Sequence, residues 1–197
     1  MMDDILEALP ARRGHFLLES GYHTDLWFTL DALFVSPRDV APLVTALADR
    51  LRPHGASAVC GPLLGGAFLA QAVATVLGVD FFFSEPAARR SGTAFYAAEY
   101  RLPPALEHRI RGARVALVDD VISAGSSVRA TAAALAAAGA STEAVGTLLA
   151  LGKKAVDDFA GRGVPFEALG RRDFTMWEPG VCPLCRTGTL LEDPVDK

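Results

Sequence analysis

Short apolar runs alternate with helix-like segments between residues 57 and 151, and this alternation constrains the fold more than any other feature of the chain. The runs have the length and composition of buried strands, at residues 57–60, 79–83, 114–118 and 144–151. Helices are predicted at 65–77 and 127–138, each followed directly by a glycine. Strands that alternate with helices form a mostly parallel sheet with helices on its faces. The sequence therefore predicts an α/β core that binds ligands beyond the carboxyl ends of its strands.

The chain before residue 57 has a different pattern. Residues 3–9 predict a short helix, residues 15–30 a two-stranded hairpin, and residues 38–52 a longer helix. We therefore expect a small hood in front of the core and a tail behind it. The predicted divisions are an N-terminal hood at 1–35, a core at 36–170 and a C-terminal tail at 171–197.

Composition and charge exclude several classes of function. The hydrophobic fraction of 51% is typical of a chain with a packed core. The net charge of -4 argues against a nucleic-acid surface, because such surfaces place lysine and arginine on phosphates. No run of about 18 apolar residues predicts a membrane span, and the acidic start is unlike a secretory signal. Three cysteines do not make a disulfide framework. We expect a cytoplasmic protein that binds neither nucleic acid nor membrane.

Two acids, Asp119 and Asp120, follow the predicted strand at 114–118. Because a buried parallel strand is apolar along its length, carboxylates at its end lie at the mouth of the sheet. Small residues and a helix come next, and a small-residue loop with free helix amides can hold a phosphate; the loop is Ser123, Ala124, Gly125, Ser126 and Ser127. A ribose 5-phosphate would place its phosphate on the loop and its two ring hydroxyl groups against the acids. The alternative is a solvated turn with an ordinary helix cap.

The stretch 115–131 resembles the phosphoribosyl diphosphate (PRPP) signature of the type I phosphoribosyltransferases, in which two acids and a Thr/Ser-Gly-rich loop follow an apolar strand. The resemblance implies that Asp119 and Asp120 hold the ribose hydroxyls and that residues 123–127 hold the 5-phosphate. Ser123 and Ala124 stand where threonines are common in the family, which leaves the backbone cradle intact. The resemblance also implies Mg²⁺ as cofactor, PRPP and a nucleobase as substrates, and a homodimer in which one subunit's loop covers the other's pocket.

A second loop between a strand and a helix is rich in glycine: Gly61, Pro62, Leu63, Leu64, Gly65 and Gly66. It has neither the GxGxxG spacing of a dinucleotide site nor the Lys-Ser/Thr ending of a P-loop. The resemblance implies that this loop accepts the diphosphate of PRPP. An ordinary tight turn is the alternative.

The predicted hairpin resembles the amino-terminal segment of orotate phosphoribosyltransferases, which has the pattern Phe-x-Leu-x-Ser-Gly-x-x-Ser; here the stretch begins Phe16-Leu17-Leu18-Glu19-Ser20-Gly21. The resemblance favours orotate as the base, and a purine or another base is the alternative. The expected base-binding residues are Ser20, Gly21, His23, Phe28 and Arg129. Arg129 is equally consistent with an exposed helix position.

Two features depart from the orotate enzymes. Glu19 stands where a lysine is usual, and residues 84–100 contain no lysine, although those enzymes carry lysines and a histidine in a loop over the diphosphate. Arg89 and Arg90 join Asp119 and Asp120 as candidate catalytic residues, because a guanidinium group binds phosphate oxygens. An arginine would be a poorer proton donor than a lysine, since it is essentially always charged. The missing lysines keep a further alternative open, a regulator that senses PRPP without catalysis.

Cys182 and Cys185 form a CxxC pair near the carboxyl terminus. One such pair supplies half of a tetrahedral zinc site. The other ligands would have to come from Cys60, a distant histidine or a second subunit. The pair is consistent with a structural Zn²⁺ site, and a reduced structural turn or a redox pair stays open beside it.

Overall fold

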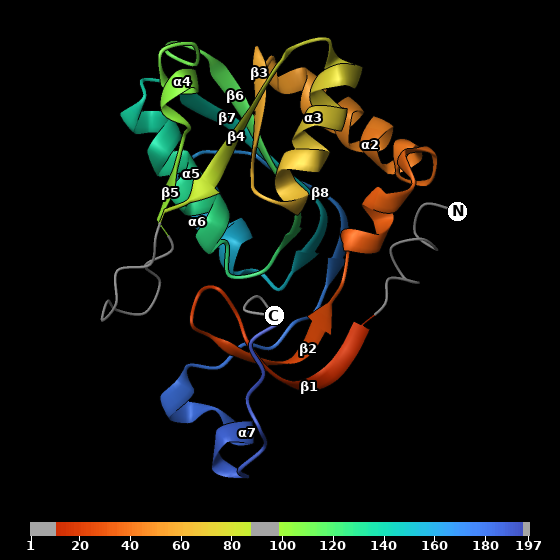
Figure 1. The fold of residues 1–197 in the computed structure, drawn as a ribbon, viewed down its shortest axis with the longest axis vertical. Helices are drawn as coiled ribbons and strands as arrows, with labels where there is room; N and C mark the ends of the chain where they lie inside the picture. The colour runs from red at the N-terminus through yellow and green to blue at the C-terminus, as the bar shows by residue number, and fades with distance from the viewer. Residues whose placement is uncertain (1–10, 88–98, 195–197) are drawn as a thin grey trace.

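The computed structural model describes residues 11–87 and 99–194, and its centre is a six-stranded sheet (Figure 1). The strands are β3 (Ala58–Pro62), β4 (Asp80–Pro86), β5 (Tyr100–Arg101), β6 (Arg114–Ile122), β7 (Ser141–Leu151) and β8 (Phe166–Arg172). Their order is β5-β4-β3-β6-β7-β8, with every pair parallel except β4 and β5. The predicted α/β class with a mostly parallel sheet is confirmed.

Both faces of this sheet are covered by helices. Helices α2 (Pro37–Leu51) and α3 (Gly65–Leu77) pack on one face, while α4 (Pro104–Glu107), α5 (Ser126–Ala137) and α6 (Lys154–Gly161) lie on the other (Figure 1). Strand β6 shows why residues 115–118 are apolar at every position. Ala116 and Val118 belong to the core under α2 and α3, whereas Val115 and Leu117 belong to cores on the opposite face.

The predicted helices agree closely with the observed ones. Helix α2 buries one side through a repeat of three and four residues, at Val40, Leu43, Val44, Leu47, Ala48 and Leu51. Helix α3 ends at Gly78, whose φ of 71° is a left-handed conformation that suits glycine. Short 3-10 turns, η1 (Asp31–Val35) and η2 (Arg52–His54), flank α2. The helix expected at 3–9 lies outside the described residues. None of the helices in the described part of the chain is long and apolar enough to span a membrane.

The hairpin and the tail pack together outside the main sheet (Figure 1). Strands β1 (Ala11–Leu17) and β2 (His23–Phe28) are antiparallel, as predicted. The amides of Leu17 and His23 donate to the carbonyls of Glu192 and Trp177, over 2.9 and 2.8 Å. The tail, with η3 (Pro179–Val181) and α7 (Pro183–Arg186), therefore lies along both edges of the hairpin. The division of the chain at residues 35 and 170 stays a prediction.

Candidate active site

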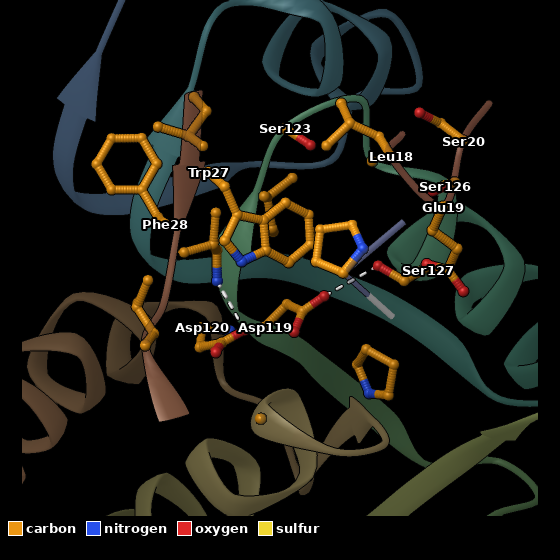
Figure 2. A pocket seen from close by; sticks show the side chains of 18 of the residues that line it. Leu18, Glu19, Ser20, Trp27, Phe28, Asp119, Asp120, Ser123, Ser126 and Ser127 are labelled. Atoms are coloured by element: carbon orange, nitrogen blue, oxygen red, sulfur yellow. Dashed lines mark hydrogen bonds between the residues drawn. The ribbon is translucent and has the colours of Figure 1, made fainter. Parts of the chain in front are cut away.

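A cavity of about 620 Å³ lies between the hood hairpin and the carboxyl ends of β3 and β6. Its polar lining is formed by two acids and a group of serines, which Figure 2 shows around one open space: Asp119, Asp120, Ser123, Ser126, Ser127 and, from the hood, Ser20 and Glu19. This position agrees with the rule that ligands bind beyond the carboxyl ends of parallel strands.

The acid pair lies inside β6, which continues to Ile122 and is longer than the predicted strand at 114–118. Asp119 is only 7% exposed. Its Oδ2 accepts a hydrogen bond from Ser127 Oγ over 3.0 Å, and its Oδ1 accepts one from the Asp120 amide over 3.1 Å. The side chain of Asp120 accepts a hydrogen bond from the Val121 amide over 2.9 Å. Both carboxylates are therefore held in place before any ligand binds.

Burial and like charge act together on Asp119. Loss of hydration raises the pKa of its carboxyl group well above the usual range, and the neighbouring charge of Asp120 raises the pKa further. The hydrogen bond from Ser127 opposes this shift. A ligand that brings hydroxyl donors or a cation would relieve the cost of the buried charge.

The loop after the acids turns into α5 through Gly125, whose φ is 78°. Ser123, Gly125, Ser126 and Ser127 line the cavity, whereas Ala124 is buried and is not among the lining residues. Because α5 begins at Ser126, the first amides of this helix lack partners within the helix and face the end of β6. The predicted phosphate loop thus has the expected strand-loop-helix geometry.

Arg129 braces this loop from α5. Its Nη1 donates to the carbonyl of Ala124 over 2.6 Å and lies 3.7 Å from Asp158 Oδ2. The side chain is partly buried and does not belong to the lining of the cavity. Its predicted contact with the base therefore has no support in this geometry.

The glycine-rich loop 61–66 lies directly against the acid pair. Pro62, Leu63, Leu64 and Gly65 line the cavity, and the Leu63–Leu64 peptide is cis. A Cβ atom on Gly65 would lie 2.4 Å from Asp120 Oδ2, and one on Gly66 would lie 2.6 Å from Asp119 Oδ1. Gly61 and Gly66 lie behind the cavity, where a Cβ on Gly61 would be 2.1 Å from the carbonyl oxygen of Gly66. These positions are glycine because the start of α3 and the end of β6 approach so closely.

The hood closes the cavity from the other side. Leu18, Leu26, Trp27 and Phe28 supply apolar surface, and Ser20 supplies a hydroxyl group (Figure 2). Ser20 is 2% exposed, and its Oγ has no hydrogen-bond partner among the described residues. A buried hydroxyl without a partner is uncommon and indicates a partner supplied by a ligand.

Comparison with known proteins identifies the family. Residues 42–161 match the model of the phosphoribosyl transferase domain. Over 195 residues the chain is 32% identical to the orotate phosphoribosyltransferase of Thermotoga maritima, covering 98% of this chain and 97% of that protein. The chain belongs to the type I phosphoribosyltransferase family.

Solved phosphoribosyltransferase structures have the same fold. The orotate phosphoribosyltransferase of Mycobacterium tuberculosis superposes with a TM-score of 0.65 at 20% identity, over 86% of this chain and 94% of that one. An adenine phosphoribosyltransferase from Thermoanaerobacter pseudethanolicus gives 0.63 at 16% identity, over 87% of this chain and all of that one. The family inferred from the acid pair and its loop is confirmed, and the shared fold does not distinguish between bases.

Several lining residues of this phosphoribosyltransferase were not expected from the sequence. Tyr100 donates from its hydroxyl group to Glu19 Oε1 over 2.8 Å, and burial, with the charge of Glu19, raises the pKa of Tyr100. Phe174 and Pro194 reach the cavity from the tail. No local motif marks these residues, because each comes from a segment that only the tertiary fold brings to the site. Trp27 had a signal, since it lies in a predicted aromatic strand beside Phe28.

The remaining predicted site residues lie elsewhere. Gly21 forms the hairpin turn with a φ of 83°, and His23 points to a cluster with Cys185 rather than to the cavity. Arg89 and Arg90 lie outside the described residues, so their proposed contact with the diphosphate stays a prediction.

Proposed function

We propose that this phosphoribosyltransferase transfers the 5-phosphoribosyl group of PRPP to orotate and releases diphosphate, a step of pyrimidine nucleotide synthesis. The observation that carries the proposal is one cavity lined by the acids Asp119 and Asp120, by the two loops that lead into α3 and α5, and by an aromatic hood whose Ser20 hydroxyl group has no partner among the described residues. The relative from Thermotoga maritima, named an orotate phosphoribosyltransferase, supports the choice of base because its similarity extends over the hood as well as the core.

The 5-phosphate would bind at the start of α5. The amides of Ser126 and Ser127 and the hydroxyl of Ser123 are available there, and the positive end of the helix favours an anion. The ribose hydroxyls would then donate to Asp119 and Asp120. This contact replaces the lost hydration of Asp119 and explains why a costly buried charge is kept.

The diphosphate would bind along the loop at 61–66, next to the acid pair. Carboxylate and phosphate oxygens are the ligands that Mg²⁺ prefers, so Asp119 and Asp120 suit a Mg²⁺ ion that reaches this site with PRPP. When bound, the ion would offset the negative charge that develops on the leaving diphosphate. The acids also favour the positive charge that develops on the ribosyl carbon.

Orotate is a planar ring with carbonyl oxygens and a carboxylate. The aromatic and aliphatic side chains of the hood can cover its faces, and Ser20 Oγ can donate to one of its oxygens. Arg89 and Arg90 remain the proposed source of positive charge over the diphosphate. With no lysine in residues 84–100, proton transfer to the leaving group must use another donor than in the orotate enzymes.

A panel of bases tests the proposal. The protein is incubated with PRPP, Mg²⁺ and either orotate, uracil, adenine or hypoxanthine, and the release of diphosphate is measured. We expect release with orotate and a loss of at least about 100-fold in a variant with both Asp119→Asn and Asp120→Asn. Release with a different base alone would reassign the substrate. Tight binding of PRPP without release in the presence of any base would favour a sensor.

The proposed activity also suggests where and in what form the enzyme works. None of the three cysteines forms a disulfide bond, which agrees with a reducing cytoplasm. A homodimer is proposed because exposed apolar side chains gather near the rim of the cavity, at Leu64, Phe68 and Val35. Two of these come from α3 and the loop before it, so a partner seated there would lie beside the bound diphosphate.

A further inference from the structure

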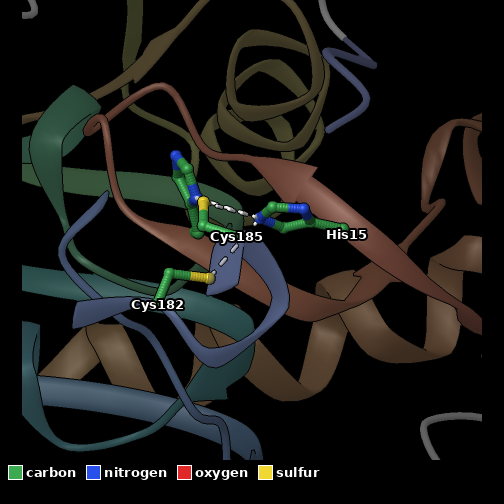
Figure 3. A group of neighbouring side chains, drawn as sticks. His15, Cys182 and Cys185 are labelled. Atoms are coloured by element: carbon green, nitrogen blue, oxygen red, sulfur yellow. Dashed lines mark hydrogen bonds between the residues drawn. The ribbon is translucent and has the colours of Figure 1, made fainter. Parts of the chain in front are cut away.

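Four side chains of the kinds that bind metals meet where the tail crosses the hood hairpin. His15 and His23 come from the two strands of the hairpin, and Cys182 and Cys185 come from the start of α7 and its last turn. Their ligand atoms all lie within 4.8 Å of one another, and Figure 3 shows both thiols turned toward His15. None of the four lines the cavity.

The separations within this cluster, which extend to 4.8 Å, span those of a tetrahedral site. The Sγ atoms of Cys182 and Cys185 lie 3.5 and 3.7 Å from His15 Nε2. The Sγ of Cys185 lies 3.2 Å from His23 Nδ1, and the two nitrogens are 2.9 Å apart. A tetrahedral zinc ion with Zn–N of about 2.0 Å and Zn–S of about 2.3 Å holds its ligand atoms roughly 3.3–3.8 Å apart. A small rearrangement of the four side chains would bring the ligand atoms to these separations.

The hydrogen bonds around His15 prepare it to bind a metal. Its Nδ1 lies 2.8 Å from the carbonyl oxygen of Thr189, which can only accept, so the ring proton must be on Nδ1. The lone pair of Nε2 therefore points into the cluster. Metal-binding histidines are held by this kind of second hydrogen bond to a carbonyl. Without a metal ion, only hydrogen bonds through a few shared protons would hold the two sulfurs and two imidazole nitrogens together.

We propose that His15, His23, Cys182 and Cys185 bind one zinc ion and that this ion fastens the tail to the hood. Both thiols lose their protons on binding and both histidines are neutral, so the site gains two negative charges against the two positive charges of the ion. An electrically neutral centre suits this location, because His15, His23 and Cys182 are at most 4% exposed. Two nitrogen and two thiolate ligands in tetrahedral arrangement select zinc among the common divalent ions.

The chain supplies all four ligands of this site itself. The CxxC pair needed two more ligands, and two histidines more than 150 positions away in the sequence supply them. Cys60 is not involved, because it lies on β3 in the core of the sheet, where burial raises the pKa of its thiol to about 12. A second subunit is not needed to complete the site.

The ion would position the base-binding part of the cavity. Leu18, Glu19 and Ser20 lie between the two histidine ligands in the sequence, while Phe174 and Pro194 lie on either side of the cysteine pair. All five line the cavity. Fixing the four ligands to one point therefore holds both walls of the hood, and loss of the ion would loosen them without changing the loops for phosphate.

Metal analysis of the purified full-length protein tests the site directly. The protein is prepared in reductant without chelator, and we expect about one zinc per chain. Protein stripped by a chelator should then bind one Co²⁺ and show the intense visible absorption of a tetrahedral ion with thiolate ligands. Less than a tenth of an equivalent after zinc is supplied under reducing conditions, or the weak absorption of an octahedral Co²⁺ ion, would overturn the proposal.

Variants connect the ion to the four residues. Cys185→Ser and His23→Asn should lower bound zinc at least tenfold, while Cys60→Ala and His108→Asn, which change the same residue types elsewhere, should keep one zinc per chain. If the ligand variants retain a full equivalent with unchanged affinity, the site is wrong. A variant that fails to fold leaves the metal analysis of the wild-type protein as the deciding measurement. In folded ligand variants the KM for the base should rise severalfold while the binding of PRPP is kept, and an unchanged KM would overturn the positioning role.

Discussion

Ser20 combines three properties that are seldom found together: it is buried, it lines the cavity, and its hydroxyl group lacks a partner among the described residues. Removal of this hydroxyl group breaks no hydrogen bond within residues 11–87 and 99–194. Removal of its contact with a ligand should cost about 1 kcal/mol of binding free energy.

We therefore expect Ser20→Ala to raise the KM for orotate by roughly fivefold, with kcat changed less and with the melting temperature unchanged or slightly higher. Steady-state kinetics and a thermal unfolding curve measure both effects. Ser141→Ala, at an exposed position on β7, is the matched control and should change neither. A melting temperature several degrees lower in Ser20→Ala would show instead that the hydroxyl serves the fold.

Asp119 shows a conflict between stability and binding at the level of one side chain. Because burial raises the pKa of Asp119 in the folded state, its ionised form destabilises the fold above the pKa of the unfolded chain, about 3.9. The native protein loses this part of its stability as the pH rises from about 4 through the folded pKa.

Asp119→Asn removes the charge and keeps the shape, so it should raise the free energy of unfolding by roughly 0.5–2 kcal/mol at pH 7.5. The gain should disappear near pH 3, where most of the wild-type carboxyl group is protonated in both states. Urea unfolding of both proteins at the two pH values, with PRPP absent, tests this expectation. A variant that is less stable than the wild type at pH 7.5 would contradict it.

At the scale of elements, the site depends on the contact between the start of α3 and the end of β6. The strand does not stop before the acids, as the apolar run suggested, because its pairing with β7 continues: Asp119 lies opposite Thr147, and Val121 lies opposite Leu149. The hydroxyl group of Thr147 also donates to the carbonyl of Asp120 over 3.0 Å. These contacts come from a distant strand, so the local sequence could not reveal them.

Gly65→Ala tests this contact. The new Cβ would lie 2.4 Å from Asp120 Oδ2, and the carboxylate would have to move away from the ribose hydroxyls. We expect kcat/KM for PRPP to fall at least about tenfold while stability changes by less than about 1 kcal/mol, since alanine is the better helix former. Gly161→Ala, at the end of α6 with no atom within 4 Å of the added Cβ, should leave the kinetics unchanged. Wild-type kinetics in Gly65→Ala would show that the acid pair tolerates displacement.

At the scale of the whole molecule, an exposed apolar patch connects the cavity to the proposed dimer. Phe68 is 47% exposed and lies 6.0 Å from the ring of Phe34, while Leu64 and Val35 beside them are more exposed still. Isolated apolar side chains are normal on a protein surface, whereas a group of them at the rim of a site indicates a partner.

We expect the wild-type enzyme to be a dimer by light scattering and Phe68→Glu to shift it toward monomer, because a charge in an apolar interface loses its hydration. Val76→Glu, on the same helix two turns further along, is the control and should remain dimeric. A monomeric wild-type protein at micromolar concentration would remove the proposal.

The sequence by itself determined the parts of this protein in which function depends on neighbours along the chain. The apolar strand, the acids Asp119 and Asp120, the small-residue loop and the start of α5 are consecutive, so their order predicted the phosphate site, and the family comparison confirmed the family to which it belongs. The α/β alternation predicted the sheet in the same way. Both are local patterns, in which the spacing of residues sets the direction of their side chains.

Only the tertiary structure decided which distant segments meet. The cavity is lined in part by residues that no motif marks, namely Tyr100, Phe174 and Pro194. Cys182 lies beside His15 and His23, which are far away in the sequence. Arg129, for which the sequence left a contact with the base and an exposed helix position equally open, braces the carbonyl of Ala124. Such contacts depend on how the tail and the hood pack over the sheet, and packing is a property of surfaces formed by many residues rather than of any short stretch of chain.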